Sequence, residues 1–278
     1  WDLQMVAIEQ NGEKEKTEKS GRSGALPWIG EGMYKMNWTA PKGYKRAVLV
    51  FDGAMSQPVV SVNGKEAGKW AYGYNAFRID ITPFIQFGKS NLIEVHLNNV
   101  EESSRWYPGG GLYRPVSVEL YGNENFSTWD TFVRTLKADK QEAEVEVNAL
   151  LEGKTGKSGK TVIALLDEAG KKVAEQTVTG ANPEIKTTLK VANPQLWSPE
   201  SPYLYQVKLT RYEGKKVADV QTLKTGIRTI SVSKEYGFQL NGVTRKLKGV
   251  CLHHDLGPLG AAENKAALIR QIKMMKQM

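Results

Sequence analysis

The sequence predicts a mainly β protein in which two antiparallel β-sandwiches are followed by a single strand–loop–helix unit. Short stretches that alternate apolar and polar residues, with turn residues between them, recur along most of the chain. This is the pattern of antiparallel sheets with one buried face. The period changes only near the C-terminus, where Leu268, Ile272 and Met275 share one helical face and Asn264 is a suitable N-cap.

The composition is that of a globular protein. With 278 residues, 40% of them hydrophobic, the chain can form more than one packed core. The net charge is +8, but the 38 basic residues are interleaved with 30 acidic ones and form no basic stripe or known module, so we expect no nucleic-acid partner. No apolar run reaches the ~18 residues of a membrane span, so we expect no membrane partner.

The two ends of the sequence carry little information on the compartment. Trp1 is not followed by the charged and apolar regions of a signal peptide, so we expect that such a peptide has been removed or was never present. The one cysteine, Cys251, excludes an internal disulfide and leaves the compartment open. Because Cys251 lies in an apolar run, we expect it to be buried.

The first sandwich is predicted after a poorly patterned, charged N-terminal stretch over residues 1–32, which we expect to be an exposed loop. Asn63 and Gly64 predict a two-residue hairpin turn, because both residue types accept positive φ. The predicted strands of this sandwich are residues 34–38, 47–51, 59–62, 77–81, 91–97 and 116–120.

An unusual loop, residues 103–114, lies between the last two of these strands. Arg105 has a planar, charged guanidinium, Trp106 and Tyr107 have flat aromatic faces, and a glycine triplet lets the backbone turn tightly. These features favour contact with a polar ligand, and the alternative is that the two aromatic residues fill a domain interface. A phosphate site is disfavoured, because no helix follows the glycines.

The second sandwich is predicted after a polar linker near residues 122–127. About seven strands in about 100 residues, without a cluster typical of catalysis, indicate an immunoglobulin-like spacer domain. Trp197 lies near two prolines at a strand entrance, and we expect it to pack in the fold rather than to stack on a sugar. The clearest predicted strands are residues 144–147, 162–166, 173–178, 185–191, 203–209 and 217–223.

A third unit begins after Thr225, and its main feature is a predicted buried strand over residues 245–252 that ends at His253-His254-Asp255. Function in a (β/α) barrel lies at such strand ends, although one βα unit cannot close a barrel. Zinc is disfavoured, because adjacent histidines on a strand point to opposite faces, and a serine triad lacks its nucleophile elbow. We favour a hydrogen-bonding platform for a polyol over a purely structural histidine pair.

Three motifs in this order resemble the family 2 glycoside hydrolases, which comprise β-galactosidases, β-glucuronidases and β-mannosidases. Residues 104–114 resemble the end of their sugar-binding domain, residues 197–205 their sandwich, and residues 248–255 their first barrel strand. The resemblance spans nearly the whole chain. It implies a jelly-roll sugar-binding domain, an immunoglobulin-like β-sandwich and the first βα unit of an incomplete TIM barrel, over residues 1–122, 123–226 and 227–278.

The resemblance implies retaining hydrolysis of β-glycosides, with β-galactosides favoured by the His253-His254-Asp255 form of the strand motif. It places His253 against the sugar in the cleavage subsite and makes His254, Asp255, Arg105, Trp106 and Tyr107 further substrate-binding candidates. Arg105 stands where well-known relatives have an aspartate. The two catalytic glutamates, roughly 5 Å apart, are expected beyond Met278, and Glu263 matches neither of their motifs. The 278-residue chain is therefore expected to be inactive.

The partner implied is a β-linked oligosaccharide or glycoside. No cofactor or metal is indicated, although the resemblance leaves open a divalent or monovalent cation and homo-oligomers in the full-length enzyme. A periplasmic or secreted bacterial location is favoured, and the cytoplasm stays open. The alternative is a self-standing, non-catalytic carbohydrate-binding or adhesion protein of two β-sandwiches, which should bury Leu268, Ile272 and Met275 within its own fold.

Overall fold

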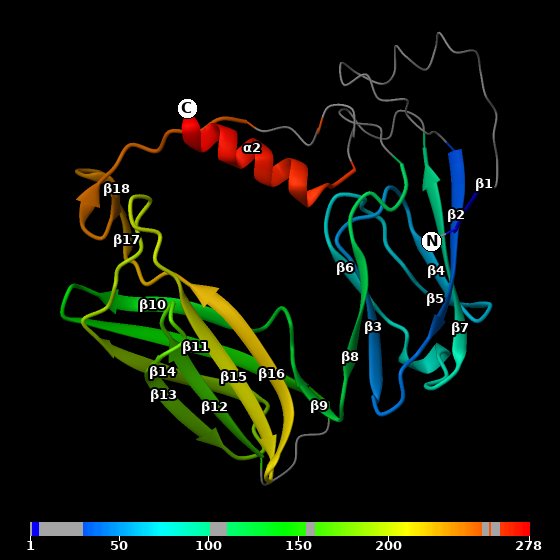
Figure 1. Ribbon diagram of the computed structural model, residues 1–278, viewed down its shortest axis with the longest axis horizontal. Helices are drawn as coiled ribbons and strands as arrows, with labels where there is room; N and C mark the ends of the chain where they lie inside the picture. The colour runs from blue at the N-terminus through cyan, green and yellow to red at the C-terminus, as the bar shows by residue number, and fades with distance from the viewer. Residues whose placement is uncertain (1, 6–29, 101–109, 154–158, 252–255, 257–261) are drawn as a thin grey trace. The chain divides into compact units, whose positions relative to one another are not determined.

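The computed structural model describes residues 2–5, 30–100, 110–153, 159–251, 256 and 262–278 (Figure 1). It divides into two compact units, one formed by Trp1–Leu120 with Cys251–Met278 and the other by Tyr121–Val250. The mainly β fold is confirmed, because all but one of the described elements longer than one turn are strands. The three-part division predicted at residues 122 and 226, the jelly-roll assignment and the TIM barrel stay predictions.

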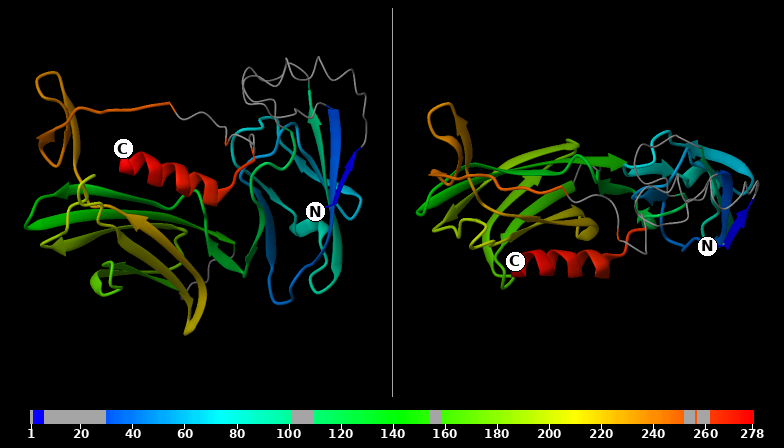
Figure 2. Two further views of the ribbon diagram at one scale, coloured as in Figure 1. Left: turned by 45° about the horizontal axis from the view of Figure 1, so that its top comes forward. Right: turned by 90° about the horizontal axis from the view of Figure 1, so that it is seen from above.

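The first unit is a sandwich of two sheets, whose strands lie in two layers (Figures 1 and 2). The strand orders are β1-β2-β7-β4-β5 and β6-β3-β8. The hairpin turn predicted at Asn63 and Gly64 is confirmed, with φ of 52° and 77° between β4 and β5. The bounds are β1 Asp2–Met5, β2 Gly30–Thr39, β3 Arg46–Phe51, β4 Val59–Val62, β5 Lys65–Lys69, β6 Phe77–Asp80, the 3-10 helix η2 Thr82–Phe84, β7 Ser90–Asn99 and β8 Val116–Tyr121.

The core of the first unit follows from the period-two pattern of these strands. On β7, every second residue from Asn91 to Asn99 is buried while its neighbours are partly exposed. Residues of both sheets therefore meet in one apolar cluster. Its buried members are Ala47, Leu49, Phe51, Ala54, Val60, Val62, Phe77, Ile79, Ile81, Ile93, Val95 and Leu97.

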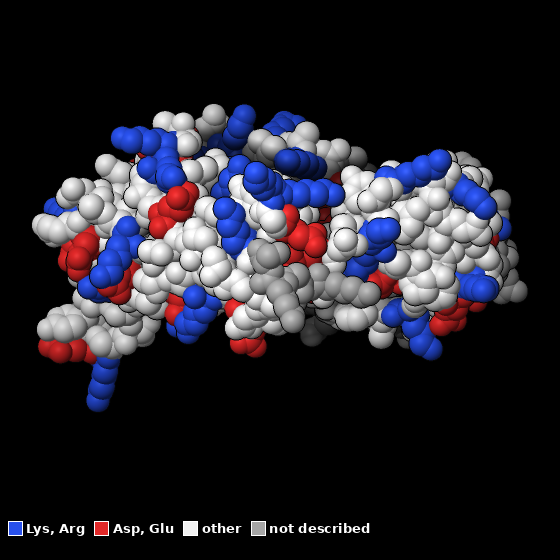
Figure 3. Space-filling model, turned by 90° about the horizontal axis from the view of Figure 1, so that it is seen from below, with Lys and Arg blue, Asp and Glu red and all other residues white. Residues whose placement is uncertain are grey.

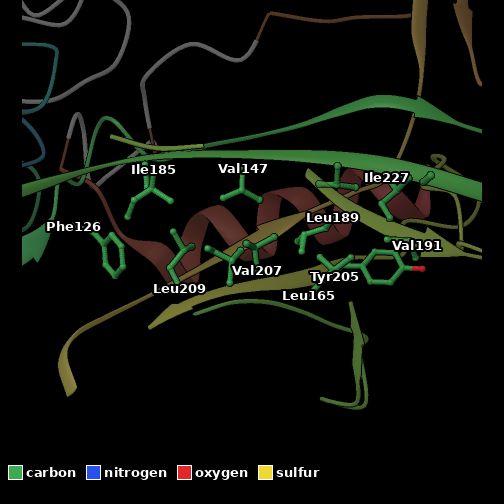
Figure 4. Close-up of a cluster of buried hydrophobic side chains, with 14 of the residues drawn as sticks. Phe126, Val147, Leu165, Ile185, Leu189, Val191, Tyr205, Val207, Leu209 and Ile227 are labelled. Carbon is green, nitrogen blue, oxygen red and sulfur yellow. The ribbon is translucent and has the colours of Figure 1, made fainter. Parts of the chain in front are cut away.

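The second unit is a sandwich of two four-stranded sheets, with orders β10-β11-β14, extended by β9, and β13-β12-β15-β16. Figure 4 shows the apolar side chains of its sheets meeting between them, among them Val147, Leu189 and Leu209. The bounds are β9 Glu124–Phe126, β10 Phe132–Ala138, β11 Glu142–Gly153, β12 Gly159–Leu166, β13 Lys172–Thr179, β14 Glu184–Ala192, β15 Tyr205–Glu213 and β16 Lys216–Thr225.

One ion pair lies inside this second sandwich. Arg211 of β15 is 1% exposed, and its guanidinium donates from Nε and Nη2 to the two carboxylate oxygens of Glu124 on β9, at 2.9 and 3.0 Å. Arg211 also donates to the Thr161 hydroxyl at 3.3 Å and to the Gly180 carbonyl at 3.3 Å. Gly159 is required beside it, because a β-carbon there would collide with the guanidinium. The first residues of the unit are thereby joined to its central strands.

A small sheet and an extended segment follow. Strands β17 (Ile230–Ser233), β18 (Gly237–Leu240) and β19 (Val243–Thr244) form a three-stranded antiparallel sheet. The predicted buried strand over residues 245–252 is wrong for its described part, because residues 245–251 form no strand and Leu247 and Val250 are 76% and 86% exposed. Cys251 is exposed as well, against the expectation. An apolar strand is buried only when neighbouring strands pair with it, and no described strand pairs with this segment.

The predicted C-terminal helix is confirmed as α2 (Lys265–Gln277). Its N-cap is Asn264, whose side-chain oxygen accepts from the backbone N–H groups of Ala266 and Ala267. None of its thirteen residues, all of them described, is buried. Across the described residues, no helix has the length and apolar character that crossing a membrane requires.

Candidate functional site

The six substrate-binding residues predicted from the sequence lie outside the described residues. Arg105, Trp106 and Tyr107 fall in residues 101–109, and His253, His254 and Asp255 fall in residues 252–255. Their roles stay predictions. Residues on either side of both segments are described.

The described residues on the two sides of residues 101–109 are held by two adjacent residues, Met55 and Ser56. On the side of β7, the Ser56 hydroxyl donates to the Asn98 carbonyl at 2.5 Å, and the Asn98 N–H donates to the Ser56 carbonyl at 2.9 Å. On the other side, Met55 and Gly111 exchange both backbone hydrogen bonds, at 3.0 and 2.8 Å. Asn98 and Gly111, which lie before and after this segment in the sequence, are therefore held at neighbouring positions, and we call Met55, Ser56, Asn98 and Gly111 the loop base.

Tyr113 and Arg114 fasten the loop base to the segment between β5 and β6. The buried Tyr113 hydroxyl donates to the Gly73 carbonyl at 2.8 Å, and Arg114 Nη1 donates to the Tyr74 carbonyl at 3.0 Å. The Arg114 guanidinium lies 5.1 Å from the centre of the Tyr113 ring. Burial raises the pKa of the Tyr113 hydroxyl above its usual value of 10, which favours the neutral form that donates this hydrogen bond.

Two glycines allow this close packing. A β-carbon at Gly53 would lie 2.7 Å from the Tyr113 hydroxyl oxygen, and one at Gly111 would lie 2.5 Å from the Tyr34 hydroxyl oxygen. Gly111 also has φ of 102°, which other residues rarely adopt. The glycine triplet that the sequence places in this loop thus has at least one member that the backbone requires.

Glu263 joins the second predicted segment to the same place. Its backbone N–H donates to the Tyr113 carbonyl at 2.8 Å, and its carboxylate lies 3.5 Å from Arg114 Nε. Asp255 comes eight residues before Glu263, so the two Cα atoms are at most ~29 Å apart. Tyr107 comes six residues before Tyr113, so their Cα atoms are at most ~22 Å apart. The structure therefore brings Tyr113, which follows the first predicted segment, into contact with Glu263, which follows the second. Sequence reasoning assigned no role to Glu263, whose observed role is this anchoring.

Trp197 of the second unit is engaged by its own neighbours. The Arg228 guanidinium lies 5.1 Å from the centre of its ring, and a β-carbon at Gly226 would lie 2.7 Å from its Cγ. Its carbonyl accepts from Asn241 Nδ2 at 3.0 Å. The half-buried indole thus has a packing role, as expected.

A groove of about 630 Å³ opens beside Trp197. Its lining includes Ile230, Phe238 and Leu247 together with Arg228 and Arg245. Arg245 is paired through both Nη atoms with the carboxylate of Glu200, at 2.6 and 2.9 Å. The Arg245 hydrogen bonds hold the pKa of Glu200 down at about 2.

Charges of both signs are interspersed on the face of the molecule seen in Figure 3. Among the described residues, no group of three or more His, Cys, Asp or Glu side chains is placed to hold a metal ion.

Comparison with known proteins places the chain in a family. Residues 127–228 match the model of the glycosyl hydrolases family 2. The chain is 36% identical to the β-galactosidase BoGH2A of Bacteroides ovatus, over 98% of this chain and 33% of that protein. The chain belongs to the family 2 glycosyl hydrolases. The chain is also 36% identical to a putative β-glucuronidase of Formosa agariphila, over 100% of this chain and 27% of that protein.

Solved structures agree with this family 2 assignment. A glycosyl hydrolase family 2 member from Bacteroides cellulosilyticus superposes with a TM-score of 0.85 at 38% identity, over 91% of this chain and 34% of that one. A β-glycosidase from Bacteroides vulgatus does so with a TM-score of 0.84 at 28% identity, over 96% and 34%. The family 2 chain thus spans about a third of the length of the relatives that it matches.

Proposed function

We propose that this chain is the N-terminal, non-catalytic part of a family 2 glycosidase that cleaves β-glycosides, with β-galactosides as its substrates. The carrying observation is the match over 98% of the chain to a β-galactosidase three times its length. In this role the chain supplies one wall of the sugar site, and the two catalytic glutamates belong to the enzyme outside residues 1–278.

The anchoring of both predicted segments supports this role. Tyr113 follows Arg105–Tyr107 in the sequence, and Glu263 follows His253–Asp255. Tyr113 and Glu263 are in contact, although the two segments are about 150 residues apart in the sequence. A sugar subsite needs polar and aromatic groups that converge on one ligand, and a shared anchor is how a chain achieves this. The proposed contacts are a hydrogen bond from His253 to the sugar and stacking by Trp106 or Tyr107.

The exposed face of α2 favours this proposal over a self-standing binding protein. Leu268 is only half-buried, and Ile272 and Met275 are 54% and 42% exposed. A self-standing protein should bury this apolar face in its own fold, whereas the first helix of a larger barrel would pack on further elements.

A β-glucuronide is the second candidate substrate. A relative described as a putative β-glucuronidase is as similar as the β-galactosidase, at 36% identity. The guanidinium of Arg105 is suited to bind a carboxylate with two hydrogen bonds, and a uronic acid carries such a carboxylate. The preference for galactosides rests on the histidine pair, and that for glucuronides rests on Arg105.

The test uses the protein encoded by the whole reading frame, assayed with the 4-nitrophenyl β-glycosides of galactose, glucuronic acid and mannose. We expect kcat/KM to be highest for the galactoside and the 278-residue chain alone to give no turnover. Preference for the glucuronide, lost in Arg105→Met, would replace the galactoside by the second candidate. If residues 1–278 alone hydrolyse a glycoside and a Glu→Gln substitution within them abolishes this turnover, the non-catalytic role is refuted. If the whole enzyme hydrolyses none of the glycosides, the assignment as a glycosidase is refuted.

A further inference from the structure

Two aromatic side chains are strongly exposed in the segment between β5 and β6. Trp70 is 39% exposed and Tyr72 is 59% exposed. Large aromatic rings on a protein surface are common at sites that bind a ligand or partner, because each ring adds apolar area at little entropic cost.

Trp70 is the outer member of a column of three parallel rings. Phe51 and Phe77, both fully buried, stack with centroids 4.6 Å apart and planes 6° apart. Phe77 stacks in turn with Trp70 at 5.5 Å and 8°. The indole N–H donates to Asn75 Oδ1 at 2.9 Å. Because one face of the indole lies on Phe77, its exposed area is on the opposite face and the edge, and the orientation of that face is fixed from the core.

Tyr72 belongs to a segment that is fixed in the same way. Its ring lies 5.6 Å from that of Tyr74, tilted by 55°. The backbone directly after Tyr72 is held by the hydrogen bonds from Tyr113 to Gly73 and from Arg114 to Tyr74. Tyr113 and Arg114 come two and three residues after Gly111 of the loop base. The segment that carries Trp70 and Tyr72 is therefore hydrogen-bonded to the residues that follow the predicted sugar-contact loop.

We infer that Trp70 and Tyr72 form a second carbohydrate-binding surface, which packs against the outer pyranose rings of a neutral β-linked oligosaccharide whose reacting sugar lies at the proposed site. This inference rests on the proposed function and specifies its substrate as an oligosaccharide. A pyranose ring presents a face of C–H bonds, with partial positive charge, that matches the negative face of an aromatic ring. The Cα atoms of Trp70 and Tyr72 are at most ~7 Å apart, which is within the length of a short oligosaccharide.

The test measures saccharide binding to the 278-residue chain by saturation-transfer NMR. The probes are β-1,4-linked tetrasaccharides of galactose, glucose and mannose, and methyl β-D-galactoside as the single-sugar comparison. We expect one tetrasaccharide to bind more tightly than the single sugar, and Trp70→Ala and Tyr72→Ala each to weaken its binding about tenfold, the loss of one packed aromatic face. Trp70→Phe, which keeps a ring on Phe77, should retain most of the binding.

Trp129 provides the matched control, since it is an exposed tryptophan of the second unit, 65% exposed. Trp129→Ala should bind like the wild type, and all variants should keep the wild-type circular dichroism spectrum. Equal affinity of wild type and Tyr72→Ala, no tetrasaccharide binding, or self-association of the chain through these rings would each overturn the inference. Failure of the whole enzyme to hydrolyse nitrophenyl glycosides would instead refute the proposed function, because that assay needs no outer sugar.

Discussion

Replacing Glu124 by Gln should destabilise the second unit strongly, although it changes one atom of one side chain. Glu124 is 3% exposed and neutralises Arg211, which is 1% exposed. The substitution leaves the guanidinium in place, surrounded by the strands of the sandwich, without a counter-charge. Breaking one partner of a buried ion pair is costly because the remaining charge is still desolvated.

The magnitude follows from the contacts. The carboxylate accepts two charge-assisted hydrogen bonds, at 2.9 and 3.0 Å, each with a net contribution of about 1.5–3 kcal/mol. Glutamine retains one acceptor oxygen, so we expect a loss of about 3 kcal/mol, at the lower end of the roughly 3–5 kcal/mol for a broken buried pair. For a unit of this size, the midpoint of thermal unfolding should fall by about 10 °C.

Differential scanning calorimetry of the chain and its variants measures this shift. Glu175→Gln is the control, since it removes a surface partner of Lys172 and should leave the midpoint unchanged. The double variant Glu124→Leu with Arg211→Met should lose less stability than Glu124→Gln, because it removes both charges. A shift below about 3 °C for Glu124→Gln, or a double variant that is less stable than the single one, would refute this reasoning.

Three further predictions concern the other contacts. Tyr113→Phe leaves the Gly73 carbonyl without its donor, and we expect a loss of about 1–3 kcal/mol in chemical denaturation. Gly226→Ala places a methyl group 2.7 Å from the Trp197 ring, and the forced repacking should cost about 1–3 kcal/mol by the same measurement. Glu200 has a folded pKa of about 2 against an ordinary 4.5, so the stabilisation that it provides should be complete above pH 4.5 and be lost as the pH falls through about 2.

Each of these three has a control and a contradicting result. Tyr44→Phe, at a 41% exposed tyrosine, should leave stability unchanged. A similar loss of stability in Tyr44→Phe would show that the loss in Tyr113→Phe does not report the hydrogen bond to Gly73. A Gly226→Ala variant as stable as the wild type would show that the indole can move aside. For Glu200, unfolding midpoints of wild type and Glu200→Gln should converge between pH 4.5 and 2, and a constant difference would contradict the ion pair with Arg245.

The sequence predicted those parts of the fold that local chemistry determines. The alternation over residues 91–97 places the buried row of β7 correctly, because strand periodicity depends only on neighbouring residues. The turn at Asn63 and Gly64 and the cap at Asn264 were predicted for the same reason. The family, too, followed from three short motifs.

Long-range partners were the part that the sequence did not predict. The apolar run at residues 245–252 indicates a buried strand, but burial depends on partner strands that no local pattern specifies. The ion pair of Arg211 with Glu124, 87 residues apart, was missed as well. One signal was available, since Arg211 continues the row of Tyr205, Val207 and Leu209 on the inner face of β15. The anchoring of Glu263 on Tyr113 had no such signal.

That last contact has a consequence for synthesis of the protein on the ribosome. Tyr113 and Glu263 are about 150 residues apart, and the whole second unit lies between them. At ~5–20 residues per second, the first unit waits about 8–30 s after Tyr113 is made before Glu263 exists. Closing a loop of this length costs about 4–5 kcal/mol of chain entropy unless the second unit has already folded and shortened it. All strands of the first sandwich are made long before Glu263, so the sandwich can fold early and its contact with Glu263 forms last.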